Sequence, residues 1–300
     1  MVGKTHTLAV KRSFDPGDIV VYAFLILVAL SIIYPLYYMF IVSISNGLRV
    51  MRGEVIFFPL EVNWKSYQII FSDDNILRAY ANSIIYTVSG TLLALILTSL
   101  CAYPLSRKDF FGRKPFTQLI VFTMFFNSGI IPNFILIYTL GMYGTIWAII
   151  LPPAINQWYM IIMRTFFRQI PDDLHDSAFI DGANDFTIFL RIILPISKPI
   201  IATMTLFYSV WHWNSYFPAL LYLNRKITYP LTIILRNIVL ANSLSEQGSA
   251  TAMIAESNNM VIGMNIKYAI IFITILPILT VYPFVQRYFV KGMLTGSLKG

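Results

Sequence analysis

The chain has 300 residues, of which 57% are hydrophobic and only 12% are charged, with a mean hydropathy of +0.68 and a net charge of +8. Soluble domains contain about 25% charged residues, so this composition excludes an ordinary soluble fold. It also excludes disorder, because 23 Phe, 18 Tyr and 5 Trp give more apolar surface than a solvated chain tolerates. The single cysteine, Cys101, permits no disulfide within the chain, and no Cys/His cluster has metal-ligand spacing. The composition indicates a protein whose solvent is lipid.

Long runs without Asp, Glu, Lys or Arg predict the membrane spans, because a helix needs about 20 apolar residues to cross a bilayer. Residues 115–163 form a run long enough for two helices, and Gly141 and Gly144 favour a turn between them. We therefore expect an all-α, polytopic membrane protein with six transmembrane helices in a single domain, 1–300. The expected spans are about 19–45, 82–104, 116–140, 145–163, 199–223 and 268–287.

The basic residues predict the orientation, because cytoplasmic loops are enriched in Lys and Arg. Six spans place both termini on one side, and assigning that side to the cytoplasm puts most of the 22 basic residues there, including four between 107 and 114. We expect residues 1–18 to be a cytoplasmic tail, 164–198 a cytoplasmic loop and 225–267 an outer loop. The basic residues then flank membrane helices, which does not indicate a nucleic-acid partner.

Prolines are numerous in the expected spans, and they include Pro104, Pro152 and Pro153. Each removes a backbone donor and tends to kink a helix. Ordinary membrane-helix composition explains them, and so does a kinked bundle that hinges around a pathway.

The loop 164–198 contains signals for a short helix. Pro171 is followed by two carboxylates, which suit the positive end of a helix dipole, so a helix is expected to begin there. Gly182 is expected to end it, and Asn184 or Asp185 can cap the next helix. Ala178 and Gly182 are four residues apart, which predicts a shallow face that another protein's backbone can approach.

The same loop resembles the EAA loop of membrane subunits of ATP-binding-cassette (ABC) importers. Residues 176–199 read D-S-A-x-x-D-G-A-x5-F-x-x-I-x-L-P-x3-P, and the family pattern is E-A-A-x-x-D-G-A-x5-F-x-x-I-x-L-P-x3-P. Two positions depart from it, since Asp176 replaces Glu and Ser177 replaces Ala. Asp176 keeps the charge but has a shorter reach, which changes the geometry of any salt bridge at this position.

The wider chain is similar to the maltose-type carbohydrate permeases, and within them to the LplC/YtcP-like branch. The stretches that carry this resemblance are 81–87, 102–107, 199–214 and 291–300. The resemblance implies a type I ABC importer permease in the bacterial cytoplasmic membrane. Its expected partners are a second homologous permease in a heterodimer, a cytoplasmic ATPase dimer and an extracytoplasmic solute-binding protein.

The resemblance also implies that the short helix is a coupling helix, which lies between spans four and five and docks on the ATPase. The only Gly-Lys-Thr, at residues 3–5, lacks the earlier glycine of a phosphate-binding loop, so this chain is not expected to be an enzyme or to bind a cofactor. ATP and magnesium are expected in the partner ATPase. The coupling residues implied by the motif are Asp176, Ser177, Ala178, Asp181, Gly182 and Ala183.

A sugar pathway is expected to present aromatic rings, amides and hydroxyls. Trp and Tyr also mark the membrane interface and Asn often joins helices, so these residues have a second explanation. The candidates for contact with an oligosaccharide are Asn127, Asn156, Trp158, Tyr208, Trp211, Trp213, Asn214 and Tyr216.

Other functions remain open at this point. A permease for a peptide, an amino acid or phosphate would share the Asp-Gly loop. An ion-coupled transporter or channel would be expected to place Asp, Glu, Lys or Arg within its spans, and the runs defined above contain none. The outer loop 225–267 could, by resemblance, enter the cleft of a binding protein, or it could be a plain connector.

Overall fold

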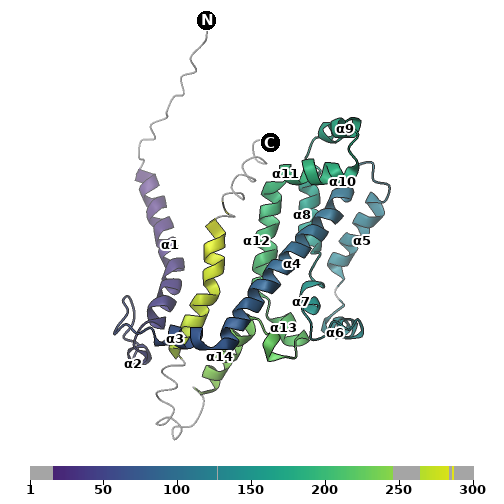
Figure 1. Ribbon diagram of the computed structural model, residues 1–300. Coiled ribbons are helices and arrows are strands. Elements are labelled where there is room, and N and C mark those ends of the chain that lie inside the picture. Colours follow the sequence, from purple (N-terminus) through teal and green to yellow (C-terminus); the bar gives the residue numbers. More distant parts are fainter. Residues whose placement is uncertain (1–15, 127, 246–263, 284–285, 287–300) are drawn as a thin grey trace.

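The computed structural model describes residues 16–126, 128–245, 264–283 and 286, and every regular element in these ranges is a helix (Figure 1). By length and composition, three helices can cross a membrane, namely α1 (Pro16–Ser43), α4 (Asp74–Ser106) and the helix Met264–Pro283, here called the C-terminal helix. The number rises to five if each of two bent pairs forms one span. The predicted all-α class is confirmed, and six crossings remain a prediction.

The centre of the fold is the contact between α4 and α12 (Lys198–Asn214). On α4, small residues recur every four positions from Gly90 to Ala102, a spacing that lets membrane helices approach closely. Larger side chains recur with the same spacing on α12, and Tyr208 places its hydroxyl 2.7 Å from Thr98 Oγ1. His212 lies against Gly90 one turn further along. The two helices therefore run antiparallel, with the ridge of one packed on the small-residue face of the other.

Two expected spans are not continuous helices. The span 116–140 is divided into α5 (Arg113–Phe125) and α6 (Ile130–Thr139), and the chain bends by 118° between the two helices. Gly129 precedes α6 with a φ of 82°, a left-handed conformation that glycine adopts without strain. The span 145–163 consists of α7 (Trp147–Ile150) and α8 (Gln157–Phe167), separated by a segment that contains two adjacent prolines.

The predicted turn between these two spans is confirmed. Gly141 and Gly144 both have left-handed backbone conformations, with φ values of 69° and 78°. The chain there leaves α6 and enters α7, as two closely spaced glycines predict.

The region after α8 is also more divided than expected. It begins with α9 (Asp172–Ile180) and α10 (Asp185–Ile188). A π-helical turn at Phe189–Ile193 and α11 (Leu194–Ile196) follow, and the chain bends by 82° into α12. The span expected at 199–223 is formed by α12 and, after a break, α13 (Phe217–Tyr222).

The outer loop expected at 225–267 contains a 3-10 turn, Lys226–Thr228, and the helix α14 (Leu231–Ser245). Residues 246–263 of that loop, and residues 1–15 of the expected tail, lie outside the described part of the chain. Two further short helices, α2 (Gly47–Met51) and α3 (Lys65–Ser72), connect α1 to α4.

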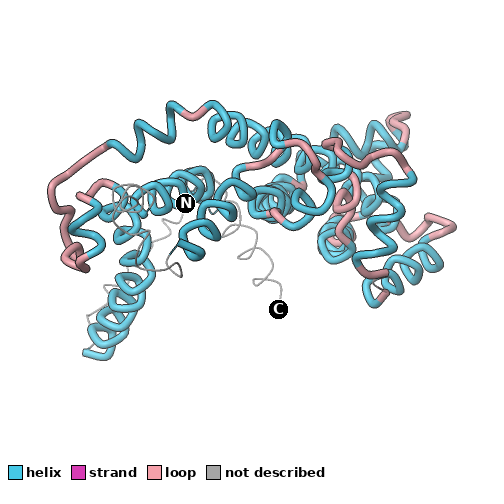
Figure 2. The backbone as a smooth tube through the Cα atoms, turned by 90° about the horizontal axis from the view of Figure 1, so that it is seen from below, coloured by secondary structure: helices cyan, strands magenta, loops and turns pink. Residues whose placement is uncertain are grey.

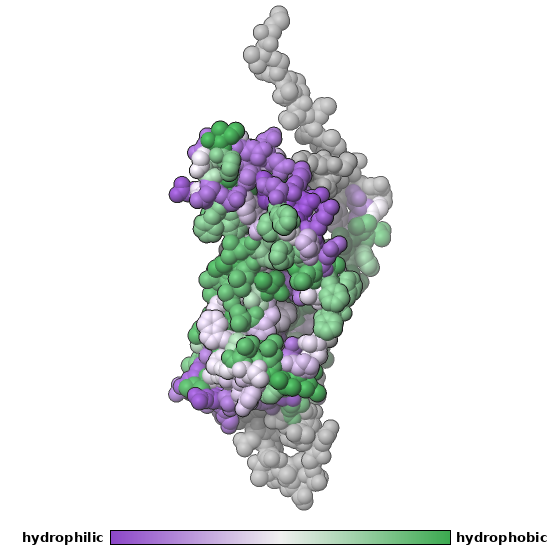
Figure 3. All heavy atoms as spheres, turned by 90° about the vertical axis from the view of Figure 1, so that its right-hand side faces the viewer, coloured by the Kyte–Doolittle hydropathy of each residue, from purple (hydrophilic) through white to green (hydrophobic). Residues whose placement is uncertain are grey.

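The first turn of α1 and the last turn of the C-terminal helix lie at the same end of the molecule as α9 (Figure 1). The helices α2, α3 and α13 lie at the other end. Seen from below, the helices form an elongated arrangement rather than a closed ring (Figure 2). On the face drawn in Figure 3, hydrophilic residues gather at both ends and hydrophobic residues lie between them. This distribution is the one expected of a chain surrounded by lipid along its middle.

Candidate functional site

The helix α9 is defined by local signals at both ends, as the sequence predicts. It begins directly after Pro171, with Asp172 and Asp173 in its first turn. At its other end the Gly182 N–H donates to the carbonyl of Phe179 at 3.0 Å, and the Ala183 N–H donates to Ala178 at 3.0 Å. These two bonds and the Gly182 φ of 81° form a Schellman motif.

Ion pairs and a buried histidine hold α9 against the rest of the molecule. Lys108 Nζ lies 2.9 Å from Asp172 Oδ2, and Arg107 Nη1 lies 3.5 Å from Asp172 Oδ1. The hydrogen bond from Lys108, together with its charge, lowers the pKa of the Asp172 carboxyl. His175 is buried and its Nε2 lies 3.1 Å from Asp185 Oδ1. The helix is therefore tied to the end of α4 and to α10.

The predicted coupling residues divide into two groups. Asp176, Ser177, Asp181 and Gly182 are exposed. Ala178 is buried and Ala183 half-buried, and both pack in the chain's own hydrophobic core. Ala178 therefore does not belong to the shallow outer face expected from its spacing with Gly182, because the inner face of α9 is the one that contains His175 and Ala178.

Sequence reasoning missed the large apolar side chains on the outside of this region. Ile180 is 83% exposed, Phe179 is 64% exposed and Phe186, on α10, is 62% exposed. Exposed apolar groups next to carboxylates at a polar end of the molecule indicate a protein-binding surface. We call the exposed residues Asp176, Ser177, Phe179, Ile180, Asp181 and Gly182 the α9 surface. Once 175 and 178 are recognised as inward positions, the helical period assigns 180 to the outside. It does not assign 179, which follows 175 by one turn and lies at the edge of the inner face, where its ring stacks on that of His175.

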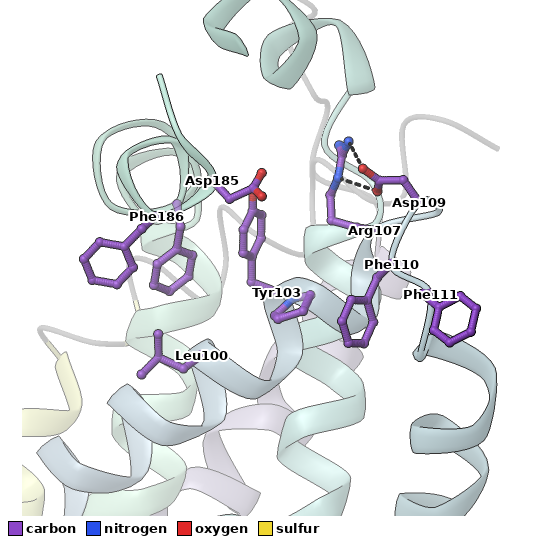
Figure 4. A pocket seen from close by; sticks show the side chains of 10 residues that line it. Leu100, Tyr103, Arg107, Asp109, Phe110, Phe111, Asp185 and Phe186 are labelled. Carbon is purple, nitrogen blue, oxygen red and sulfur yellow. Dashed lines mark hydrogen bonds and ion pairs between the residues drawn. The ribbon is translucent and has the colours of Figure 1, made fainter. Parts of the chain in front are cut away.

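A cavity of about 500 Å³ lies between the end of α4, the segment that follows it, and α10 (Figure 4). Asp185 and Phe186 line one side of it, and the Arg107–Asp109 ion pair, with Nε and Oδ1 3.1 Å apart, lines the other. The ring of Tyr103 lies between these two sides in Figure 4. Arg107, which lines the cavity, also reaches Asp172 at the start of α9.

Three of the predicted pathway residues are structural. Tyr208 is buried and its hydroxyl contacts Thr98 and accepts the Asn156 N–H at 3.2 Å. Asn156 caps α8, where its Oδ1 accepts the Tyr159 N–H. Trp213 is buried and donates its Nε1–H to the carbonyl of Thr274 at 2.9 Å. Burial and hydrogen bonding explain why these side chains are polar and aromatic, without any ligand.

Three other predicted pathway residues come together. Trp211, Asn214 and Tyr216 line an open groove of about 700 Å³ where α12 ends and α13 begins. Trp158 is exposed on α8 and does not line this groove. Asn127 lies outside the described residues. In the described part of the chain, no group of three His, Cys, Asp or Glu side chains is arranged to hold a metal ion.

Comparison with known proteins identifies the family. Residues 74–295 match the family model described as "Binding-protein-dependent transport system inner membrane component". This chain belongs to that family. It is a membrane component of a transport system, an inner-membrane permease, and not an enzyme.

Full-length relatives support this assignment. The permease is 41% identical to the "Polygalacturonan/rhamnogalacturonan transport system permease protein YtcP" of Bacillus subtilis (strain 168), over 94% of this chain and 98% of that protein. It is 39% identical to "Protein LplC" of the same organism, over 98% of both chains. The predicted resemblance to the LplC/YtcP-like branch is confirmed.

A solved structure supports the fold. The chain is similar to one in the crystal structure of a bacterial ABC transporter involved in the import of the acidic polysaccharide alginate, with 33% identity and a TM-score of 0.83. The match covers 92% of this permease and 99% of that chain. The expected type I importer permease fold is therefore confirmed.

Proposed function

We propose that this permease forms one half of the translocation pathway of an ABC importer for oligosaccharides, with a second homologous permease forming the other half. The observation that carries the proposal is the α9 surface, in which two carboxylates and two large apolar side chains are exposed at a polar end of the molecule. A surface of this kind suits a soluble partner.

The proposed partner at the α9 surface is a cytoplasmic ATPase dimer, which would bind and hydrolyse ATP with magnesium. In this proposal the permease itself binds no cofactor. Asp181 and Asp176 would provide polar contacts, and Phe179 and Ile180 the apolar ones. The ion pairs from Asp172 to Lys108 and Arg107 would transmit movement of α9 to α4. Transport would then follow from rocking of the helices between two states.

An oligosaccharide is the proposed substrate because the relatives point to polysaccharides. One relative is named for polygalacturonan and rhamnogalacturonan, and the solved transporter for alginate, an acidic polysaccharide. These names favour degradation products of polysaccharides over a peptide, an amino acid or phosphate. An extracytoplasmic binding protein would deliver the substrate.

The proposed orientation places both termini in the cytoplasm of a bacterium, with the permease in the inner membrane. Its support is that α9, the first turn of α1 and the last turn of the C-terminal helix lie at one end of the molecule (Figure 1). If the ATPase binds α9, that end faces the cytoplasm. The outer loop containing α14 then faces the binding protein.

Reversing the charge of one exposed carboxylate tests the coupling proposal. Asp181→Lys is expected to abolish uptake of labelled oligosaccharide by whole cells, while the permease still assembles in the membrane. The ATPase should no longer copurify with it, because the new cation faces a partner surface that accommodates an anion. Asp74→Lys is the matched control, since Asp74 is exposed on α4 at the opposite end. Unimpaired uptake by Asp181→Lys would remove the coupling assignment.

A further inference from the structure

The groove between α12 and α13 is a second site, distinct from the α9 surface. It has a volume of about 700 Å³, within the range of small-molecule sites. Its wall includes Trp211, Asn214, Ser215, Tyr216, Phe217 and Tyr282. We call it the α12–α13 groove.

The depth of the groove shows which solvent surrounds it. Lys198 begins α12 and suits a membrane surface. The 17 residues of α12 rise about 25 Å, which is less than the roughly 30 Å of the hydrocarbon core. The break after Asn214 therefore lies at membrane depth.

Lipid is a poor occupant of the groove. The backbone leaves its helix at residues 215–216, and non-helical backbone at membrane depth is tolerated only when protein covers it or water reaches it. The amide side chain of Asn214 is exposed at this break. Leaving such groups to hydrocarbon is costly. The exposed amide and the non-helical backbone therefore favour water or a polar ligand over lipid in the groove.

The lining specifies the chemistry of that ligand. Among the described residues that line the groove, none carries a charge, so a free ion would find no counter-charge there. Six aromatic rings offer flat apolar surfaces, and an amide and hydroxyls offer hydrogen bonds. A pyranose ring matches this combination, because it has apolar C–H faces and a rim of hydroxyl groups.

A second cavity of about 490 Å³ shares the lining residues Trp211 and Pro218 with the groove. That second cavity also has no charged residue in its described lining and includes Asn133. Trp211 is 39% exposed and forms a wall common to both. The pair of cavities therefore offers space for successive rings of a chain, which suits an oligosaccharide better than a single small solute.

We propose that the α12–α13 groove binds pyranose rings of the transported oligosaccharide, with Trp211 as the stacking surface and Asn214 as a hydrogen-bonding group. This rests on the proposed function. The groove lies where α12 ends and α13 begins, and α13 lies at the end of the molecule opposite α9 (Figure 1). In the proposed orientation this is the end where the substrate arrives. The groove selects ring faces and hydroxyl groups, so any carboxylate of an acidic sugar stays in the water of the cavity.

The test uses the complete transporter, with both permeases, the ATPase and the binding protein, reconstituted in vesicles and supplied with labelled trigalacturonate. Trp211→Leu and Asn214→Ala are expected to raise the substrate concentration for half-maximal uptake about tenfold. Trp211→Phe is expected to stay within about threefold of the wild type, because it keeps a flat ring. Trp147→Leu is the control, since Trp147 is 55% exposed and lines neither cavity.

Distinct results overturn the groove and the proposed function. If the wild-type complex takes up the sugar and the Leu and Phe variants behave alike, the groove does not bind sugar but the transport proposal stands. If Trp211→Leu instead releases the second permease during purification, the groove is a subunit interface and the inference is overturned. If the wild-type complex takes up no oligosaccharide while its ATPase is active, the proposed function and this inference both fail.

Discussion

Gly90 provides a direct test of how closely α4 and α12 approach each other. A Cβ atom at this position would lie 2.5 Å from both Cε1 and Nε2 of His212 and 2.8 Å from its Nδ1. His212 is only 5% exposed, so its ring has little space into which to move. Gly90→Ala must therefore push the two helices apart or displace the ring.

The size of the effect follows from two opposing contributions. Overpacking a close-packed interior costs about 1–3 kcal/mol. Alanine in a helix interior gains about 1 kcal/mol over glycine. Because the added Cβ would lie 2.5 Å from a ring with little room to move, the upper half of this range applies, a net loss of about 1–2 kcal/mol. This corresponds to a melting temperature lower by about 2–8 °C.

Thermal unfolding of the purified permease in detergent measures this loss, with tryptophan fluorescence as the signal. Gly17→Ala in α1 is the matched control, because no atom lies within 4 Å of a Cβ placed there, and its melting temperature should not fall. His212→Ala removes the ring that the new methyl group contacts. In the double variant the methyl group should therefore cost less, with a coupling of about 0.5–3 kcal/mol. A Gly90→Ala protein that melts at or above the wild-type temperature, or a cycle without coupling, would refute the close-approach argument.

Two further predictions concern α9. Gly182→Ala is expected to lower stability by about 1–2 kcal/mol because of the left-handed backbone at this position, and not because of a steric contact, since no atom lies within 4 Å of a Cβ there. Amide hydrogen exchange in α9 should become faster in Gly182→Ala and less so in Gly182→Asn. Equal exchange rates in the wild type and both variants would contradict this cause. Asp172→Asn is expected to lower stability by only about 0.2–1 kcal/mol, because Asp172 and Lys108 are exposed to solvent, although Arg107 is half-buried. Salt screens exposed charges, so most of the loss should vanish in 1 M salt. Because the pKa of Asp172 is depressed, its contribution to stability is fully present above pH 3.8, the ordinary pKa of an aspartate, and is lost as the pH falls below that value. The difference in melting temperature between the wild type and Asp172→Asn should therefore be the same at pH 6 and pH 8.

The sequence by itself determined the solvent, the helical class and the ends of α9. Charge-free runs require helices, because backbone groups in lipid must be bonded within their own segment. The start of α9 after Pro171 and its end at Gly182 are local, since each depends on the conformations and dipoles of a few consecutive residues. The spacing of the motif at 176–199 was equally visible without a structure.

Tertiary structure decided which face of each helix serves which purpose. Trp211 and Trp213 are two residues apart on α12, yet one lines the groove and the other is buried against Thr274. Periodicity alone gives no phase in an apolar helix, because every side is hydrophobic. The phase of α12 is set by its contact with the small-residue face of α4, more than 100 positions earlier in the chain. Ala178 turned inward for the same kind of reason, because the rest of the fold fixes which side of α9 meets the core.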